Sequence, residues 1–386
     1  MRSRTLHLPA GAAPREMLDD ASAEAGRAPD LVLGFLPPEE GICDTLASLA
    51  AAWPASLRFG CEAVTQFADR DMTTRGSLQL FWFDQPGHHA LVEVVTGSHE
   101  EPPAPEIVAD LAQRLSASDG ALLIVDGLRF PAEQFLGDLR SRLGEGRTPL
   151  VAGGLASQEF PTDRIGARVF FQERIYSAAC LAVAFHGVEM RVEVVRGWSP
   201  ASPVYTVTRA EGPGGNVVQE IDGEAAVEWY RRFFTIRGTA GSELAPMPDS
   251  AWRFPLLIEG PAPERQGLYR SMRAFDDPPG AVTYWGSVHT GDRVRLGIGN
   301  DRSLVDTASQ LTAGQVPEAA ILYSCVGREL VLGEMAPDEV SNIHRALGGV
   351  ALSGFFTFGE IGPTPRGGLA FYNQTAILVL LSEERA

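Results

Sequence analysis

The sequence of 386 residues contains no lysine, so all 32 of its basic residues are arginine. Several kinds of catalysis need a lysine amine, either to form an imine with an aldehyde cofactor or to hold the phosphates of a nucleotide. The absence of lysine therefore excludes a pyridoxal-phosphate anchor, a Schiff-base mechanism, a P-loop lysine and the nucleotide-binding lysine of protein kinases.

Cysteine and long apolar segments are also scarce. The four cysteines, Cys43, Cys61, Cys180 and Cys325, stand at unrelated spacings, which predicts neither a disulfide framework nor a zinc motif. The longest apolar run, residues 178–188, is too short for a transmembrane helix. No apolar stretch typical of a signal peptide follows the basic N-terminus. These features predict a cytoplasmic protein with reduced cysteines.

The formal net charge of −17 argues against binding to nucleic acid or to an anionic membrane, because both require a basic surface. The seven histidines are scattered and match no metal-site spacing. Haem needs only one axial histidine, so the sequence does not decide whether haem binds. Neither a Gly-x-Ser-x-Gly nucleophile turn nor a Gly-x-Gly-x-x-Gly dinucleotide motif is present.

Three segments share one pattern, which is a short apolar strand, an amphipathic helix and a second strand rich in small residues. They lie at residues 31–64, 121–157 and 319–360. Each has the length of a strand–helix–strand unit, so we interpret them as related building blocks. Many strand-like stretches between them are separated by tight turns, as in antiparallel sheets. The pattern predicts an α/β (α+β) protein with mixed and antiparallel sheets flanked by helices.

The predicted organisation has two domains. Residues 1–29 are interpreted as a polar N-terminal lead-in, residues 30–223 as the first domain and residues 224–386 as the second. The boundary is placed where the turn IDG gives way to the helical pattern EAAVEWYRRFF.

Several short motifs follow one another along about 340 residues of the chain. They are VAGGLAS, RGWSP with YTVTRAEG, QEIDGEAAVEWYRR, FPLLIEG, YSCVGREL, LSGFFTFGEIGP and FYNQT. In this order they resemble the FIST proteins, which have an N-terminal and a C-terminal FIST domain. One departure is GCEAVTQF, where a Gly-Cys turn followed by small residues is expected, so no role of that turn is carried over to Cys61.

The resemblance implies a bacterial, intracellular sensory and signal-transduction module that is not an enzyme. Such a module binds a small ligand, such as an amino acid, and passes a signal to a separate partner protein. Some members of the family are haem-binding nitric-oxide sensors that act with histidine kinases, which gives a second hypothesis for this chain.

Glu360 is the most informative single residue, because it is the one carboxylate in the apolar run FFTFGEIGP. A buried glutamate needs a partner or stays protonated. Arg328, which follows another strand of the same unit, is the expected partner. This pair either locks the sheet or lines a ligand crevice at adjacent strand ends.

Other residues complete the candidate ligand-binding site. They are Cys325, Asn373 and Thr375 as polar neighbours, and Gly153 and Gly154 as positions where a ligand could approach the backbone. A ligand that carries both an ammonium and a carboxylate group suits such a lining. Cys325 is either a small core residue or a thiol activated by Arg328, and the second possibility would make the cluster of Cys325, Arg328 and Glu360 enzymatic.

Overall fold

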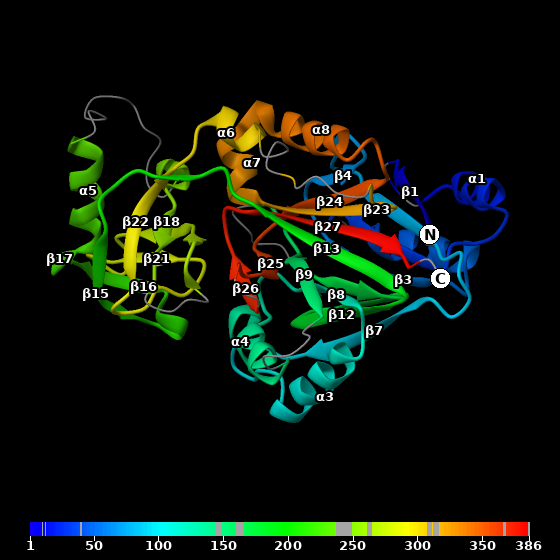
Figure 1. The fold of residues 1–386 in the computed structure, drawn as a ribbon, viewed down its shortest axis with the longest axis horizontal. Coiled ribbons are helices and arrows are strands. Elements are labelled where there is room, and N and C mark those ends of the chain that lie inside the picture. The colour runs from blue at the N-terminus through cyan, green and yellow to red at the C-terminus, as the bar shows by residue number, and fades with distance from the viewer. Residues whose placement is uncertain are drawn as a thin grey trace.

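The computed structural model describes residues 1–9, 11, 13–38, 41–143, 149–159, 166–236, 249–260, 265–306, 311, 316–365 and 368–384. The chain forms two parts, which we call the body (residues 1–198 and 299–386) and the inserted unit (residues 199–298). Figure 1 shows the inserted unit on the left and the body, with both chain ends, on the right. Both parts contain mixed or antiparallel sheets flanked by helices, which confirms the predicted fold class.

The three predicted strand–helix–strand units are all present in the body. In each unit the two strands pair in parallel, and one or two helices connect them. The units are β2 (Leu31–Leu36), α2 (Ile42–Ala52) and β3 (Leu57–Glu62); β8 (Gly120–Val125), α4 (Ala132–Leu143) and β9 (Leu150–Leu155); and β23 (Ala319–Cys325), α7 (Val326–Leu332), α8 (Ala336–Ala346) and β24 (Leu352–Thr357). Apolar strands this short and continuous are typical of parallel pairs that are covered on both faces.

Each parallel pair is the centre of a six-stranded sheet with the same strand order. A long return strand pairs antiparallel with the first strand of each unit, and an outer strand pairs with the return strand. The return and outer strands are β6 (Ser77–Trp82) with β1 (Arg2–His7), β12 (Ala179–His186) with β7 (His89–Thr96), and β27 (Ala376–Glu383) with β13 (Val188–Val195). The body therefore contains three copies of one arrangement.

Three short hairpins join these copies together. They are β4 (Gln66–Ala68) with β5 (Asp71–Thr73), β10 (Val169–Phe171) with β11 (Arg174–Tyr176), and β25 (Glu360–Pro363) with β26 (Leu369–Tyr372). Each hairpin follows one unit but completes the sheet of another: β4 pairs with β24, β10 with β3 and β25 with β9. The exchange is cyclic, so none of the three sheets is complete without another copy.

The three sheets face one central core, and the helices cover their outer faces. The central core takes residues from every sheet, including Phe35, Ile124 and Tyr323. Separate outer clusters lie under α1 (Arg15–Ala25) and α2, under α3 (Pro105–Ser116) and α4, and under α7 and α8. In the described ranges no helix has the length and apolar composition needed to cross a membrane.

The N-terminal segment differs from the expected polar lead-in at residues 1–29. It contributes β1 to the first sheet and α1 to the outer layer. Leu6, Leu8 and Leu18 are buried there. A short apolar stripe among charged residues is enough to attach this segment to the body, because its backbone also pairs with β6.

The inserted unit is a mostly antiparallel sheet that packs around one helix. Its elements are β14 (Ser199–Pro200), β15 (Tyr205–Glu211), β16 (Val217–Ile221), β17 (Glu224–Ala225), α5 (Ala226–Ile236), β18 (Leu256–Ile258), β19 (Leu268–Arg270), β20 (Met272–Phe275), β21 (Val282–Tyr284) and β22 (Arg293–Ile298). Its own core includes Val207, Trp229 and Leu296. Residue 223 lies inside this unit, and strands from both sides of residue 223 share two of the sheets in the body.

Glycine occupies one equivalent position in the second strand of each parallel pair. A Cβ atom at Gly60, Gly153 or Gly354 would lie 1.8, 1.8 or 1.9 Å from a carbonyl oxygen of the neighbouring strand. Backbone atoms cannot retreat from such a contact without breaking the strand pairing. Close strand packing is thus a sufficient reason for Gly153, whether or not a ligand approaches it.

We therefore expect Gly153→Ala to be severely destabilising, by about 3 kcal/mol or more. Gly137→Ala in α4 is a matched control, because no heavy atom lies within 4 Å of the added methyl group. This control should be neutral or slightly stabilising, since alanine favours helix. Urea unfolding of both variants measures the difference, and equal stabilities would show that the strand pair can accommodate a side chain at Gly153.

Candidate functional site

Five of the predicted site residues, Cys325, Arg328, Glu360, Asn373 and Thr375, gather at the carboxyl ends of β23 and β24, where the body meets the inserted unit. Gly153 and Gly154 lie in β9, opposite Ile361 and Glu360 of β25. Arg328, Glu360 and Thr375 have no exposed surface, and Cys325 and Asn373 retain only 4% and 1% exposure. The cluster is therefore not an open crevice. We call the contact of residues 196–198, 325–328 and 371–375 with the inserted unit the junction.

The partner of Arg328 is Glu339 on α8, so the predicted ion pair with Glu360 is wrong. The guanidinium of Arg328 donates through Nε at 3.1 Å and through Nη2 to Oε1 of Glu339. Both side chains are fully buried. Ser324 donates to the second oxygen of Glu339 at 3.2 Å. The two buried charges thus neutralise one another beneath β23.

Arg328 also holds the two chain segments that connect the body with the inserted unit. It donates to the carbonyl oxygen of Arg196, which precedes the unit, and at 3.2 Å to that of Leu304, which follows it. Leu304 belongs to α6 (Asp301–Val305). One ion pair therefore fixes both connections.

Among the described residues, Glu360 makes no ion pair with an arginine, and its contacts are hydrogen bonds and a neighbouring thiol. Its Oε2 accepts a hydrogen bond from the backbone N–H of Thr375 at 3.1 Å. Among the described residues, its Oε1 has no hydrogen-bond partner. Burial raises the pKa of Glu360 well above its ordinary value, although the Cys325 thiol, the Thr375 N–H group and the more distant Arg328 oppose the shift. Burial thus favours the protonated form of Glu360.

The threefold arrangement provides an internal comparison for this residue. Gln66 begins β4 as Glu360 begins β25, and its Oε1 accepts from the N–H of Gly76 at 3.2 Å, just before the return strand β6. Its amide group donates to the carbonyl oxygens of Ala63 and Val64. Glu360 therefore keeps the structural hydrogen bond of Gln66, while its remaining oxygen is left without a partner.

Cys325 lies at the N-terminal end of α7 with its thiol beside Glu360. The backbone N–H groups of Gly327 and Gln374 point toward the sulfur and favour the thiolate. Burial and the carboxyl group of Glu360 outweigh them and raise the pKa of the thiol well above its ordinary value. Because a protonated, buried thiol is a poor nucleophile, the geometry argues against the enzymatic hypothesis for this cluster.

Further residues of the junction were not assigned to the site from the sequence. Trp198 donates from its indole nitrogen to the carbonyl oxygen of Gln374 at 2.6 Å, and Gln374 donates to that of Trp252 at 3.4 Å. Glycine occurs in both connections, at Gly197 with φ of +80° and at Gly299 against the Trp198 ring. The motif RGWSP was recognisable in the sequence as part of the family resemblance. Its contact with the motif FYNQT could not be predicted from the sequence.

A second contact lies between the inserted unit and α4. Glu133 accepts from Arg270 at 3.0 Å and from the backbone N–H of Ser287 at 2.8 Å. Arg270 also donates to the carbonyl oxygen of Phe371 at 3.1 Å. Burial lowers the pKa of Arg270, and Glu133 opposes this change. The inserted unit is thus attached to the body by polar as well as apolar contacts.

Four buried polar atoms of the junction have no hydrogen-bond partner among the described residues. Among the described residues, Glu360 Oε1, Asn373 Oδ1, Gln374 Oε1 and Arg196 Nε are buried and make no hydrogen bond. Buried polar atoms are usually paired, because an unpaired one costs about 1–3 kcal/mol. The junction thus offers acceptor oxygens and a guanidinium to a polar ligand.

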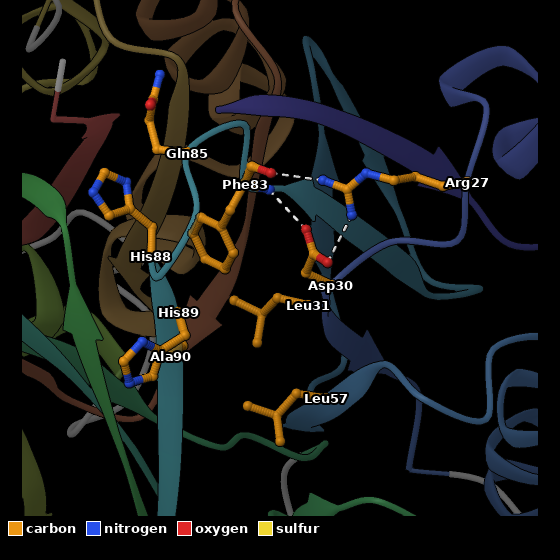
Figure 2. A pocket seen from close by; sticks show the side chains of 9 residues that line it. All are labelled: Arg27, Asp30, Leu31, Leu57, Phe83, Gln85, His88, His89 and Ala90. Atoms are coloured by element: carbon orange, nitrogen blue, oxygen red, sulfur yellow. Dashed lines mark hydrogen bonds and ion pairs between the residues drawn. The ribbon is translucent and has the colours of Figure 1, made fainter. Parts of the chain in front are cut away.

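A surface pocket of about 300 Å³ lies at the other end of the body, near the start of β2 and β3 (Figure 2). Its apolar wall contains Leu31, Leu57 and Phe83. Arg27 donates to Asp30 at 2.7 Å and to the carbonyl oxygen of Phe83 at 2.6 Å. These bonds hold the segment that follows β6. No candidate residue predicted from the sequence lines this pocket.

The pocket does not fit haem. In Figure 2 the rings of His88 and His89 point to the side opposite Leu31 and Leu57. His88 is bonded through Nδ1 to Glu383 at 2.9 Å, and His89 stacks on His186 with ring centroids 4.8 Å apart. An axial imidazole would have to face an apolar slot, and here the imidazoles and the apolar wall face different directions.

The interlocked sheets, the inserted unit and the motifs at the junction define a two-part α/β protein of the FIST class. The family model for the FIST N domain matches residues 30–224, and that for the FIST C domain matches residues 226–363. The chain belongs to the FIST family, as its motifs predicted. FIST domains are sensory signal-transduction domains rather than catalytic ones.

Two mycobacterial proteins are similar over most of their length. An uncharacterized protein of Mycobacterium tuberculosis is 26% identical over 370 residues, which cover 92% of each chain. An uncharacterized protein of Mycobacterium bovis is 26% identical over 323 residues, which cover 75% of this chain and 81% of the relative. The likeness thus includes both FIST domains.

Double-mutant cycles test the assignment of partners around Arg328. Glu339→Gln should cost about 3–5 kcal/mol, because it leaves the buried guanidinium without a charge partner. Combined with Arg328→Met, it should cost clearly less than the sum, whereas Glu360→Gln combined with Arg328→Met should be nearly additive. The measurement is the free energy of unfolding in urea. Strong coupling to Glu360 instead would restore the pair predicted from the sequence.

Thiol labelling tests the state of Cys325. Iodoacetamide should modify the exposed Cys43 first in the folded protein, while Cys325 should react only after unfolding. Mass spectrometry of peptides at increasing urea concentration gives the order of reaction. Cys61 and Cys180, which are also buried, serve as internal controls. Labelling of Cys325 at the rate of Cys43 would contradict this picture of the junction.

Proposed function

We propose that this protein is a cytoplasmic sensor that binds a small zwitterionic ligand, such as an amino acid, at the junction. The observation that carries the proposal is the group of buried polar atoms without partners contributed by Glu360, Asn373 and Gln374. The presence of four free cysteines supports a reducing compartment.

Glu360 is the centre of the proposed site. Its counterpart Gln66 fills the same structural role with every polar group bonded, so the fold itself does not require a carboxylate at this position. A ligand ammonium group would replace the proton of Glu360 and supply the missing donor. Because the site is buried, a charge-assisted bond there is stronger than one at the surface.

Ligand entry requires the inserted unit to move, since the proposed binding residues are buried. The glycines of the two connections, Gly197 and Gly299, supply a hinge on which the unit can tilt away from the body. Binding and the position of the inserted unit are therefore coupled. We propose that a separate signalling protein, such as a histidine kinase, reads this position.

Thermal and urea unfolding in the presence of each of the twenty amino acids tests the proposal. A ligand at about one hundred times its Kd should stabilise the wild-type protein by about 2.7 kcal/mol. Glu360→Gln should fold normally, since glutamine already occupies the equivalent position at Gln66, and it should lose this response.

Arg27→Gln is the matched control, because it alters the surface pocket and leaves the junction unchanged. It should keep the ligand response. A response that is lost in Arg27→Gln and kept in Glu360→Gln would assign the ligand to the pocket and contradict the proposal. A complete lack of response to the amino acids would contradict the proposed ligand class.

A further inference from the structure

Arg196 is the arginine at the junction that remains available to an anion. It lies in the connection that leads from β13 into the inserted unit, and its guanidinium stands over the ring of Tyr372, 5.7 Å from the centroid. Burial raises the pKa of Tyr372 and raises that of Tyr269 to about 12, and the charge of Arg196 opposes both shifts. Arg196 thus lies between a tyrosine of the body and a tyrosine of the inserted unit.

The fully buried arginines of the described residues differ from Arg196 in having a carboxylate partner. The pairs are Arg58 with Glu173, Arg270 with Glu133, and Arg328 with Glu339. Across the described ranges, no carboxylate lies within ion-pair distance of Arg196, and its buried Nε has no hydrogen-bond partner. A partly buried guanidinium loses solvation, and Arg196 regains part of it from Tyr372, through the ring and a hydrogen bond, and not from an ion pair.

Scarcity of acids does not explain this, because the chain has 49 acidic residues for 32 arginines. A displaced backbone does not explain the missing carboxylate partner either, because Arg328 fixes the backbone carbonyl of Arg196. The base of the side chain is thereby held in place. Its guanidinium contacts Tyr372, and its Nε has no hydrogen-bond partner among the described residues. A planar guanidinium in this state matches the two oxygens of a carboxylate.

Glu360 and Arg196 are both neighbours of Tyr372. Glu360 is the cross-strand neighbour of Tyr372 in the pairing of β25 with β26, and Arg196 covers the ring of Tyr372. A carboxyl group without a cationic partner and a guanidinium without an anionic partner, among the described residues, are therefore neighbours of one tyrosine. A small molecule with both charges can satisfy both.

We infer that Arg196 binds the carboxylate of the ligand and selects molecules that carry one. The inference rests on the proposed function, and it gives to Arg196 the role that the sequence had suggested for Arg328. Because Arg196 precedes the hinge residue Gly197, a carboxylate held there also restrains the connection to the inserted unit.

The experiment compares the twenty amino acids with their α-carboxamides by isothermal titration. The wild-type protein should bind a free carboxylate about 10- to 100-fold more tightly than the matching carboxamide. Arg196→Gln should bind both forms alike, with the affinity for the carboxamide unchanged. Arg196→Lys keeps the charge but loses the planar guanidinium, so it should retain only part of the preference for the carboxylate. This variant tests the role of Arg196 if Arg196→Gln does not fold.

Arg273→Gln is the control, because Arg273 also stands over an aromatic ring, at 4.8 Å from the centroid of Trp285, but lies outside the junction. It should keep the wild-type preference. An undiminished preference in Arg196→Gln, together with lost binding in Glu360→Gln, would overturn the role of Arg196 and leave the proposed function standing. Absence of binding by either series to the wild-type protein would overturn the proposed function itself.

Discussion

The buried ion pair of Arg328 with Glu339 is the interaction on which the junction depends. It neutralises two charges inside the body, and it also anchors the carbonyl oxygens of Arg196 and Leu304, one in each connection to the inserted unit. Desolvation makes such pairs poor sources of net stability. The pair instead fixes the geometry of the junction, because a single rigid guanidinium defines where the two connections leave the body.

This arrangement divides the molecule into a part that is hard to deform and a part that can tilt. The exchange of hairpins among three sheets makes separate movement of any one sheet costly, since strand pairing would be lost in two places. The inserted unit has its own core and meets the body through Tyr269 with Trp198, Arg270 with Phe371 and Glu133, and Trp252 with Gln374. Under the proposed function, ligand binding at the junction would displace the smaller part.

The sequence predicted those features that are encoded locally. The three strand–helix–strand units were recognisable because apolar strands and an amphipathic helix lie within one short segment. The exchange of hairpins was not recognisable, because nothing in the residues of β4 or β25 specifies which distant strand they join. The N-terminal segment was mistaken for a lead-in because its apolar stripe is short and its charged residues are many.

The site shows the same limit. Burial of Glu360 followed from its apolar neighbours, and the structure agrees with it. Its pairing with Arg328 did not follow, because Glu339 in the segment PDEVSNIHRA has the pattern of a solvated helix face while the fold turns it inward. Arg196 and Gln374 gain their importance from a contact between segments more than 170 residues apart, which pattern reasoning cannot supply.

The exchange of hairpins also has a consequence for synthesis on the ribosome. The hairpin of β4 and β5 emerges early, yet its partner strand β24 follows some 280 residues later, as the pairing of Ala68 with Ser353 shows. Until then the first hairpin has an unpaired strand edge, because the central strands of the third sheet have not been made. The body is therefore completed late in synthesis, through contacts between residues that are far apart in the sequence. A nascent chain that stalls in the inserted unit exposes that edge, which gives molecular chaperones a defined target during translation.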